Sequence, residues 1–211
     1  MGQIGKLRPA SQFRGWRILI TILYGLFSFS VNSHEISKNE VLPQVPVGGP
    51  FSLVDHTGRD VSDEDVEGEY LLVYFGFTHC PNTNPVGLFT INTALNRLGD
   101  LGRQVGPLFC TVDPARDTVD VPADYVKAFH PRMVGLTGSH EEVLAMAKTY
   151  GMDYMTGELD SEYLVYHTAF TFLMNRDGKF LRAFSRDVEI DELSHAIKED
   201  LESREDIADS S

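Results

Sequence analysis

The sequence predicts an α/β domain in which a central mixed sheet is flanked by helices. Two uninterrupted apolar runs, residues 70–77 and 108–112, have the composition of strands buried on both faces of a parallel sheet. Apolar residues recur at helical spacing between these runs, which indicates a crossover helix. Near the C-terminus, residues 168–174 and 179–184 flank an Asn-Arg-Asp-Gly turn, as in an antiparallel hairpin.

The first predicted elements along the chain are a hairpin, a strand and a helix. Residues 51–62 should form two short strands around a Thr-Gly turn, and residues 70–77 the first buried strand. A helix should begin at Pro85 and end at Gly99 or Gly102. Its apolar face repeats every three or four residues, at Leu88, Ile91, Leu95 and Leu98.

Helices and strands alternate in the second half of the chain. After the second buried strand, a helix is expected around residues 121–129 and a short strand at 133–136. Ser139 and Glu142 form a capping-box pattern, which should open a helix that ends at Gly151. Beyond the hairpin, a last helix with a polar opposite face is marked by Ile190, Leu193, Ile197 and Leu201.

The order of these elements specifies the fold. A hairpin, a βαβ unit, a helix, a strand and another helix are followed by a ββα unit. A parallel βαβ half joined to an antiparallel ββα half is the thioredoxin-like plan. We therefore expect a thioredoxin-like α/β domain with an additional N-terminal β-hairpin.

Composition narrows the class of protein. The chain has 211 residues, 42% of them hydrophobic, and carries 18 Lys and Arg against 31 Asp and Glu, a net charge of −13. This acidity argues against a nucleic-acid binder, which needs basic residues to neutralise phosphates. Two cysteines are too few for a disulfide scaffold, and the length is sufficient for one domain with its own core.

The charge is divided unevenly between the N-terminal segment and the rest of the chain. Residues 1–34 contain four basic residues and no acid, which leaves −17 on the remainder. The apolar run at 18–31 follows Arg17, a pattern typical of an export signal, and is shorter than the ~20 residues that span a membrane. We expect the rest of the chain to be exported, periplasmic or membrane-anchored, with a cytoplasmic N-terminus if the segment is not cleaved.

Four regions follow from these patterns. Residues 1–34 are interpreted as a signal or membrane anchor, and residues 35–50, rich in proline and glycine, as a linker. Residues 51–203 should form the thioredoxin-like domain. Residues 204–211 are expected to be an acidic tail.

A cysteine follows the first buried strand where the next helix should begin. Cys80 lies in a turn near a helix N-terminus, whose partial positive charge stabilises a thiolate. The thiolate is both the nucleophilic and the metal-binding form. The alternative, a small residue of the core, is disfavoured by the proline and asparagine residues of the turn.

Four segments resemble the SCO/SenC family and occur in the family's order: residues 48–81, 111–118, 125–139 and 163–181. Members are membrane-tethered, thioredoxin-fold copper proteins that help build the dinuclear copper site of cytochrome c oxidase. The resemblance implies a copper-binding assembly factor, a metallochaperone and not an enzyme. It also implies copper and cytochrome c oxidase subunit II as partners, together with a membrane if the N-terminal segment is retained.

The resemblance also implies a copper site. The family binds copper with the two cysteines of a C-x-x-x-C-P motif and a distant histidine, which correspond here to Cys80, Asn84 and His167. Because Cu(I) prefers soft thiolate and thioether donors, an amide at position 84 should weaken its binding. Tyr166 is a milder departure, since the family often has an aspartate there that could tune the ligand.

The other candidate residues have mainly structural interpretations. Cys110 is expected in the core, too far from Cys80 for a disulfide. His79 could either support the site or pack within its loop. Asp113 and Asp117 follow a strand and could approach the loop before the first helix, although their turn chemistry favours a structural role. Five histidines show no ligand spacing on one face: His34, His56, His130, His140 and His195.

Two alternative functions remain open. A single-cysteine thiol redox protein, similar to thioredoxins or peroxiredoxins, would use Cys80 as its nucleophile. A copper-dead relative would keep the fold as a binding or sensing module, which Asn84 supports. The presence of both Cys80 and His167 favours copper binding over the copper-dead interpretation.

Overall fold

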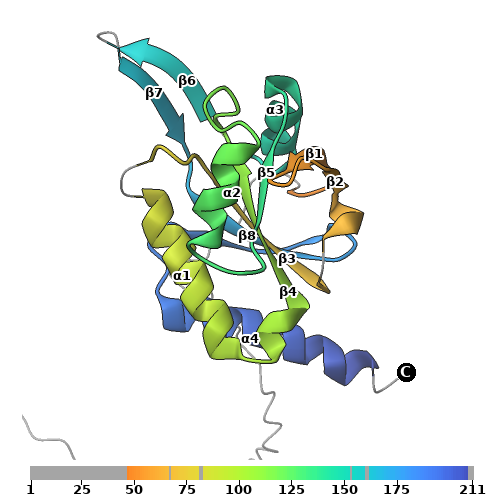
Figure 1. Ribbon diagram of the computed structural model, residues 1–211. Helices are drawn as coiled ribbons and strands as arrows, with labels where there is room; N and C mark the ends of the chain where they lie inside the picture. The colour runs from red at the N-terminus through yellow and green to blue at the C-terminus, as the bar shows by residue number, and fades with distance from the viewer. Residues whose placement is uncertain (1–46, 67, 81–82, 153, 160–161, 209–211) are drawn as a thin grey trace, which may run out of the picture. The chain divides into compact units, whose positions relative to one another are not determined.

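The computed structural model describes residues 47–66, 68–80, 83–152, 154–159 and 162–208. The predicted N-terminal segment, and the linker as far as residue 46, lie outside these ranges. The described residues contain a seven-stranded mixed sheet with strand order β2-β1-β5-β4-β3-β8-β9 (Figure 1). Its strands are β1 (Ser52–Asp55), β2 (Asp60–Ser62), β3 (Tyr70–Gly76), β4 (Val105–Thr111), β5 (Val134–Thr137), β8 (Phe170–Asn175) and β9 (Phe180–Ser185).

Three parallel strands form the centre of the sheet. β3 pairs in parallel with β4, and β4 with β5, whereas β1, β8 and β9 are antiparallel to their neighbours. On β3, Val73 and Phe75 belong to one apolar layer, while Leu72 and Tyr74 belong to the other. Because side chains alternate between the two faces of a strand, a strand apolar at every position must be covered on both sides.

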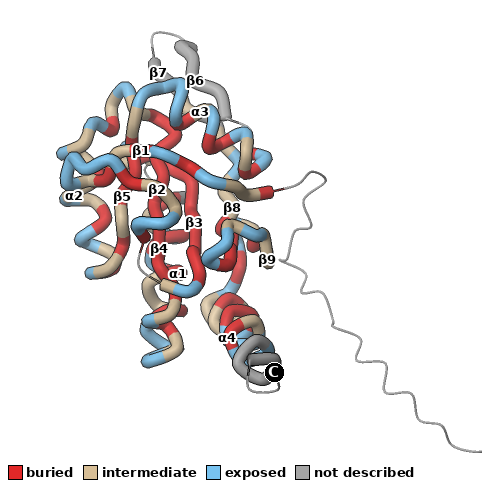
Figure 2. Tube along the Cα trace, turned by 90° about the vertical axis from the view of Figure 1, so that its right-hand side faces the viewer, coloured by how far each residue is buried: buried red, intermediate tan, exposed pale blue. Residues whose placement is uncertain are grey.

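Helices cover both faces of this sheet, which confirms the predicted α/β class. The helices are α1 (Thr83–Leu98), α2 (Asp120–Lys127), α3 (His140–Thr149) and α4 (Ile190–Ala208), with short 3-10 turns η1 (Asp63–Asp65) and η2 (Leu101–Gln104). Apolar side chains of α1, α2 and α4 pack in one layer, and those of α3 in the other. Figure 2 shows the buried central strands and the alternation of buried and exposed residues on the helices.

Local chemistry sets the ends of the helices. α3 begins with the predicted capping box: the Ser139 hydroxyl accepts from the Glu142 N–H at 3.3 Å, and the Glu142 carboxylate accepts from the Ser139 N–H at 2.8 Å. α1 is followed by Gly99, whose φ of +58° lies in the left-handed region that glycine adopts without strain. α4 extends to Ala208 and so includes residues 204–208, which the sequence assigned to the tail.

A second sheet is missing from the sequence prediction. β6 (Tyr154–Leu159) and β7 (Glu162–His167) pair as an antiparallel hairpin that projects beyond the main sheet (Figure 1). Its strands mix charged and apolar residues, and neither glycine nor proline occupies the connection at 160–161. The usual signals of a strand and a turn are therefore weak here. β7 ends at His167, one of the two predicted metal ligands.

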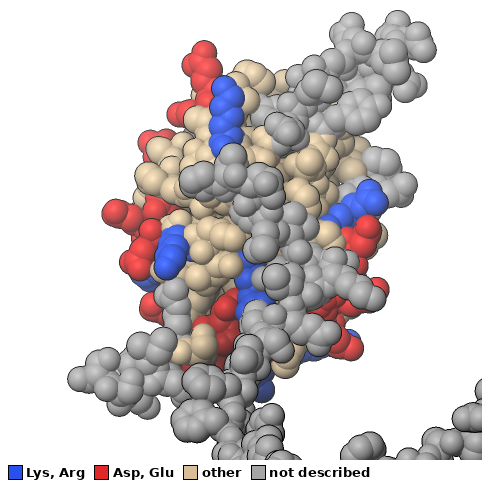
Figure 3. All heavy atoms as spheres, turned by 180° about the vertical axis from the view of Figure 1, so that it is seen from behind, with Lys and Arg blue, Asp and Glu red and all other residues tan. Residues whose placement is uncertain are grey.

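One face of the domain shows how its charged residues are distributed. On the face seen in Figure 3, acidic side chains occur at several separate places, with basic side chains among them. Within the described part of the chain, no helix is both long and apolar enough to cross a membrane.

Candidate metal site

Cys80 lies just beyond the carboxyl end of β3, in the loop that leads to α1. Its backbone N–H donates to the carbonyl oxygen of Phe77 at 3.2 Å, which closes a tight turn. The side chain is half-buried and packs against the apolar layer shared by the sheet and α3. Its thiol is free. The backbone of Cys80 is thus held in place while its side chain keeps partial access to solvent, as a reactive or metal-binding cysteine requires.

His167 reaches the same region from the end of β7. Its ring packs edge-on against the ring of Phe77, with centroids 5.6 Å apart. Burial lowers the pKa of the imidazole, and a hydrogen bond with the Thr168 carbonyl only partly opposes this. The Nδ1 atom lies 3.1 Å from the oxygen of that carbonyl. Because a carbonyl can only accept a hydrogen bond, Nδ1 carries the proton. The neutral ring therefore keeps a lone pair on Nε2, the form that binds metals.

Phe77 links the two predicted ligands. Its carbonyl accepts from the Cys80 N–H, while its ring contacts His167. The guanidinium of Arg116 also lies 5.8 Å from the centre of this ring. In the described ranges, no group of three or more His, Cys, Asp and Glu side chains is placed to hold a metal ion. The predicted set here comprises one thiol and one imidazole.

Asn84 points its polar group into the protein. The side chain is completely buried, with 0% exposure, in the first turn of α1. Its Nδ2 donates to the Phe77 carbonyl at 2.6 Å, and its Oδ1 accepts from the Tyr74 hydroxyl at 3.4 Å. Burial, with a smaller contribution from the nearby Cys80 thiol, raises the pKa of Tyr74, so that this hydroxyl stays protonated. Both ends of the carboxamide are thus engaged inside the domain.

A close approach of the backbone makes room for Asn84. A Cβ atom at Gly76, the last residue of β3, would lie 2.4 Å from the Asn84 Nδ2. A side chain at position 76 would force Asn84 or the backbone to move. Glycine at this position therefore allows the asparagine to reach the Phe77 carbonyl.

The carboxylate of Asp117 holds the loop that carries Cys80. It accepts from the Thr78 N–H at 2.8 Å, from the Thr78 hydroxyl at 2.5 Å and from the Thr111 hydroxyl at 2.7 Å. His79, which is largely exposed, places its Nδ1 3.5 Å from the same carboxylate. Asp117 therefore has the structural role that was predicted, and it acts on the loop that carries Cys80.

Asp113 belongs to the same buried loop. Its carboxylate accepts from Arg116 at 2.5 Å, and its backbone N–H donates to the Thr111 hydroxyl at 3.0 Å. Arg116 in turn lies over Phe77. The turn that contains both aspartates therefore connects β4 to the Cys80 loop. The sequence indicated only that these aspartates could approach that loop.

Cys110 is separate from the site, as predicted. It is completely buried in β4 and free, and its sulfur lies 3.5 Å from the Met146 sulfur. Burial raises the pKa of its thiol well above the usual range. His140 and His195 lie on α3 and α4, away from Cys80 in the sequence. His56 and His130 line one cavity, which their spacing in the sequence did not reveal.

The fold and the site define a class of protein: a thioredoxin-like α/β domain with one accessible cysteine at a strand-to-helix junction and a histidine beside it. The chain belongs to the SCO1/SenC family, whose sequence model matches residues 39–202. Family membership confirms the resemblance noted from the sequence.

Relatives from several eukaryotes share this similarity. The mitochondrial SCO1 homolog 1 of Arabidopsis thaliana is 37% identical over 172 residues, which cover 81% of this chain and 52% of the relative. The sco1 protein of Schizosaccharomyces pombe is 40% identical over 208 residues, covering 88% and 78% respectively. The mitochondrial SCO1 homolog of Homo sapiens is 41% identical over 155 residues, covering 72% and 52%. The chain thus spans about half the length of the Arabidopsis and human relatives.

Solved structures show the same fold. Arabidopsis thaliana ScoI with copper bound has a TM-score of 0.68 and 40% identity, with 72% of this chain and 97% of that chain covered. Yeast Sco1 with copper bound has a TM-score of 0.68 and 34% identity, with 75% and 90% covered. These matches confirm the thioredoxin-like fold class.

Proposed function

We propose that this domain binds copper as Cu(I) through Cys80 and His167 and delivers it during assembly of the dinuclear copper site of cytochrome c oxidase. The observation that supports the proposal is that Phe77 contacts both residues, its carbonyl accepting from the Cys80 N–H and its ring packing against the His167 ring. Thiolate and imidazole both suit copper. Two solved relatives contain bound copper, and the oxidase client follows from family membership.

The transfer needs only ligand exchange. Copper passes from the protein's thiolate and imidazole to the ligands of the client, and no covalent bond of the chain is made or broken. We therefore infer a metallochaperone and not an enzyme. Cys80 supplies the strongest interaction with the soft ion, and His167 completes the pair.

We infer further that the site is degenerate. Asn84 stands where the family has its second cysteine, and its carboxamide is occupied by Phe77 and Tyr74. Asn84 therefore supports the loop in place of binding the metal. A site with one thiolate fewer should hold Cu(I) less tightly, and Cys80 has no disulfide partner within this motif.

The N-terminal sequence supports transport of the domain to the far side of a membrane. The basic and apolar residues of 1–34 fit a signal or anchor, and the Arabidopsis and human relatives are named mitochondrial. We propose that the domain works on the far side of a membrane, tethered by this segment or released from it.

Anaerobic titration of the full chain with Cu(I), in competition with a chromophoric chelator, tests the function. We expect weak binding by the parent, none by Cys80→Ala and at least about tenfold weaker binding by His167→Ala. Asn84→Cys should bind much more tightly than the parent, because a second thiolate would enter beside the first. Cys110→Ala is the matched control and should leave the affinity unchanged.

The same set of variants distinguishes the alternatives. If the parent binds no copper while Asn84→Cys does, the copper-dead interpretation is correct. If the parent turns over peroxide steadily and only Cys80→Ala abolishes this, the domain is a thiol redox enzyme. Equal copper affinity in the parent and Cys80→Ala would refute the proposed ligand set.

A further inference from the structure

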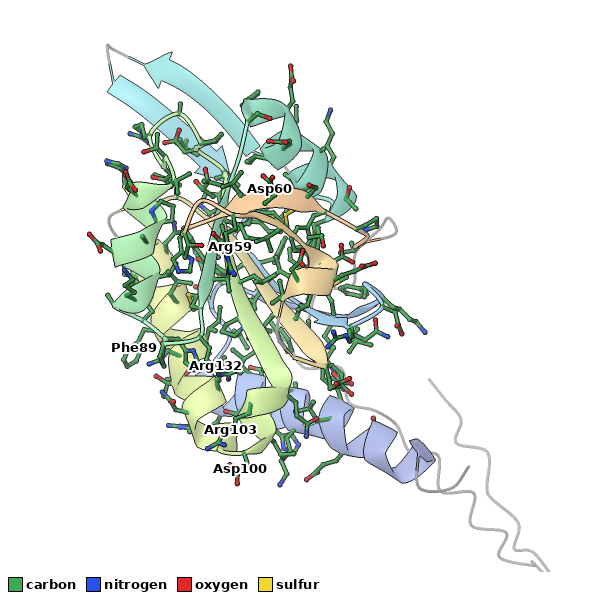
Figure 4. All side chains as sticks on the ribbon, turned by 45° about the vertical axis from the view of Figure 1, so that its right-hand side comes forward. Arg59, Asp60, Phe89, Asp100, Arg103 and Arg132 are labelled. Atoms are coloured by element: carbon green, nitrogen blue, oxygen red, sulfur yellow. The ribbon has the colours of Figure 1, made fainter. Side chains whose placement is uncertain are left out.

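An exposed apolar patch lies on α1 and consists of Val86 and Phe89. The two residues are 60% and 58% exposed, and among the side chains that the structure describes no other large apolar one is exposed. Residues three apart share one face of a helix, so the two form a single patch. Figure 4 shows Phe89 on the outer side of α1, pointing away from the sheet.

The opposite side of α1 already serves the core. Leu88, Ile91 and Leu95 are buried in the apolar layer that α1 shares with α2 and α4. The patch therefore leaves on the order of 200 Å² of apolar area in contact with water, without a role in holding the domain together.

The patch is tied to the loop that carries Cys80. Asn84, two residues before Val86, donates from Nδ2 to the Phe77 carbonyl at 2.6 Å, and the same carbonyl accepts from the Cys80 N–H at 3.2 Å. Because a helix rises 1.5 Å per residue, Phe89 lies about 8 Å further along the axis of α1 than Asn84. One side of a specific protein interface covers roughly 800 Å². A protein that covered Cys80 with such a surface would cover the patch as well.

The patch belongs to an uncharged part of the domain. The chain has no Asp, Glu, Lys or Arg between Glu69 and Arg97, a stretch that includes Cys80 as well as the patch. α2, by contrast, exposes Asp124 and Lys127. In a chain of net charge −13, an uncharged and partly apolar helix face complements a partner surface that is itself uncharged and apolar. The centres of protein interfaces have this character, with aromatic residues enriched and charged ones depleted.

A second copy of the chain and a membrane fit the patch less well. A stable dimer buries roughly 800 Å² on each subunit, several times the area of the patch. A helix that lies in a membrane interface carries Lys and Arg beside its apolar residues, whereas α1 has none before Arg97. A small uncharged patch suits a protein that binds briefly and leaves again.

We propose that Val86 and Phe89 form the docking surface for the protein that accepts copper from Cys80, and that this protein covers them with an uncharged apolar surface of its own. The inference rests on the proposed function, because ligand exchange requires the ligands of the acceptor to reach the metal. The patch holds the acceptor beside Cys80, which makes the exchange effectively intramolecular. It takes no part in holding the metal.

Copper transfer to the soluble domain of cytochrome c oxidase subunit II tests the docking surface. The full chain, loaded with Cu(I), is mixed anaerobically with a tagged, copper-free acceptor domain, which is captured at intervals so that its copper can be measured. Phe89→Gln should slow the transfer about tenfold and Val86→Gln about threefold, as loss of apolar contacts of these sizes predicts. Glutamine preserves the helix, because it is a better helix former than valine or phenylalanine. Asn96→Gln, exposed further along α1, is the matched control and should transfer copper at the parental rate.

Association of the two metal-free proteins gives a second readout. Biolayer interferometry with the immobilised acceptor should show the same order of effects on Kd, with the double variant Val86→Gln/Phe89→Gln weakest. Raising sodium chloride from about 50 to about 500 mM shortens the Debye length several-fold and should leave the parental Kd nearly unchanged. A loss of tenfold or more would indicate charged contacts and contradict the inference.

The affinity for copper separates this inference from the proposed function. All of the glutamine variants should bind Cu(I) as tightly as the parent in the chelator competition. If the parent binds no copper, the proposed function fails, whereas association of the metal-free proteins still tests the docking surface.

Three results would overturn the inference. The first is an absence of association, or equal association and transfer by the parent and the double variant. The second is self-association of the parent that the double variant loses, because the patch would then serve a second copy of the chain. The third is binding of the parent to phosphatidylcholine vesicles that the double variant loses, because the patch would then serve a membrane.

Discussion

The Asp117 carboxylate accepts two hydrogen bonds from Thr78, one from the Thr78 N–H at 2.8 Å and one from the Thr78 hydroxyl at 2.5 Å. The loop after β4 thereby fixes the loop after β3, in which Cys80 lies two residues further on. Asp117 is completely buried, and hydrogen bonds of charged groups away from water are strong. The position of the cysteine consequently depends on a carboxylate from another part of the chain.

Replacing Asp117 with asparagine should destabilise the domain and loosen the Cys80 loop. The amide keeps one acceptor and brings a donor toward groups that themselves donate, so we expect a loss of about 1–3 kcal/mol in the free energy of unfolding. Urea unfolding measures this loss, and faster hydrogen exchange at the Thr78 N–H would locate it. Asp124→Asn, at an exposed position of α2, is the control and should change neither quantity.

The two cysteines should differ sharply in reactivity. Cys80 is half-buried, whereas Cys110 is fully buried and burial raises the pKa of its thiol. A thiol reagent should therefore modify one cysteine in the folded protein and both after denaturation. Cys80→Ser should abolish the reaction of the folded protein, and Cys110→Ala should leave it intact. Rapid labelling of Cys110 in the folded state would contradict its assignment to the core.

Arg182 should be important for stability. It joins β9 to α4 by donating to the Asp200 carboxylate, with its Nε at 2.7 Å and its Nη2 at 3.3 Å. Because both side chains are largely buried, Arg182→Ala leaves an acid without its partner and should cost about 3–5 kcal/mol in the free energy of unfolding. Arg186→Ala removes an exposed arginine from the loop after β9 and should change stability by less than about 1 kcal/mol.

Asp55 should contribute stability that depends on pH. Burial disfavours its charged form, but hydrogen bonds from Thr57 and Arg59 outweigh this and hold the pKa of the carboxyl well below its usual range. The unfolded chain, with a pKa of about 3.9 at this residue, binds the proton first as the solution is acidified. The contribution is therefore complete above that pH and decreases as the pH falls below it.

A comparison with Asp55→Asn measures this contribution. The variant should be less stable than the parent by about 1–3 kcal/mol at neutral pH. The difference should shrink as the pH falls below about 4, because the parent then loses the charged interaction as well. Urea unfolding at a series of pH values gives both curves. Asp60→Asn, exposed on the same hairpin, should follow the parent, and a constant difference for Asp55→Asn would exclude the linkage.

Strong local signals made most of the fold predictable. The apolar run at 70–77 requires cover on both faces, and the regular spacing of Leu88, Ile91 and Leu95 fixes a helix that supplies part of that cover. The capping box at Ser139 set a helix start correctly. The β6–β7 hairpin was missed because its strands carry mixed residues and neither glycine nor proline marks the turn between them. In such a segment, pairing between strands and not composition determines the structure.

The turn around Cys80 was enough to propose it as a site residue, and a family pattern was needed to propose roles for His167 and Asn84. Only the tertiary structure decided how these residues behave. The hydrogen bond to Thr168 selects the His167 tautomer, the contacts of Asn84 with Phe77 and Tyr74 turn its amide inward, and the loop of Asp117 reaches Thr78. His56 and His130 likewise share a cavity that no sequence spacing indicates. Sequence determines which groups are available, whereas tautomers, burial and shared partners depend on contacts between distant segments, which only the folded chain creates.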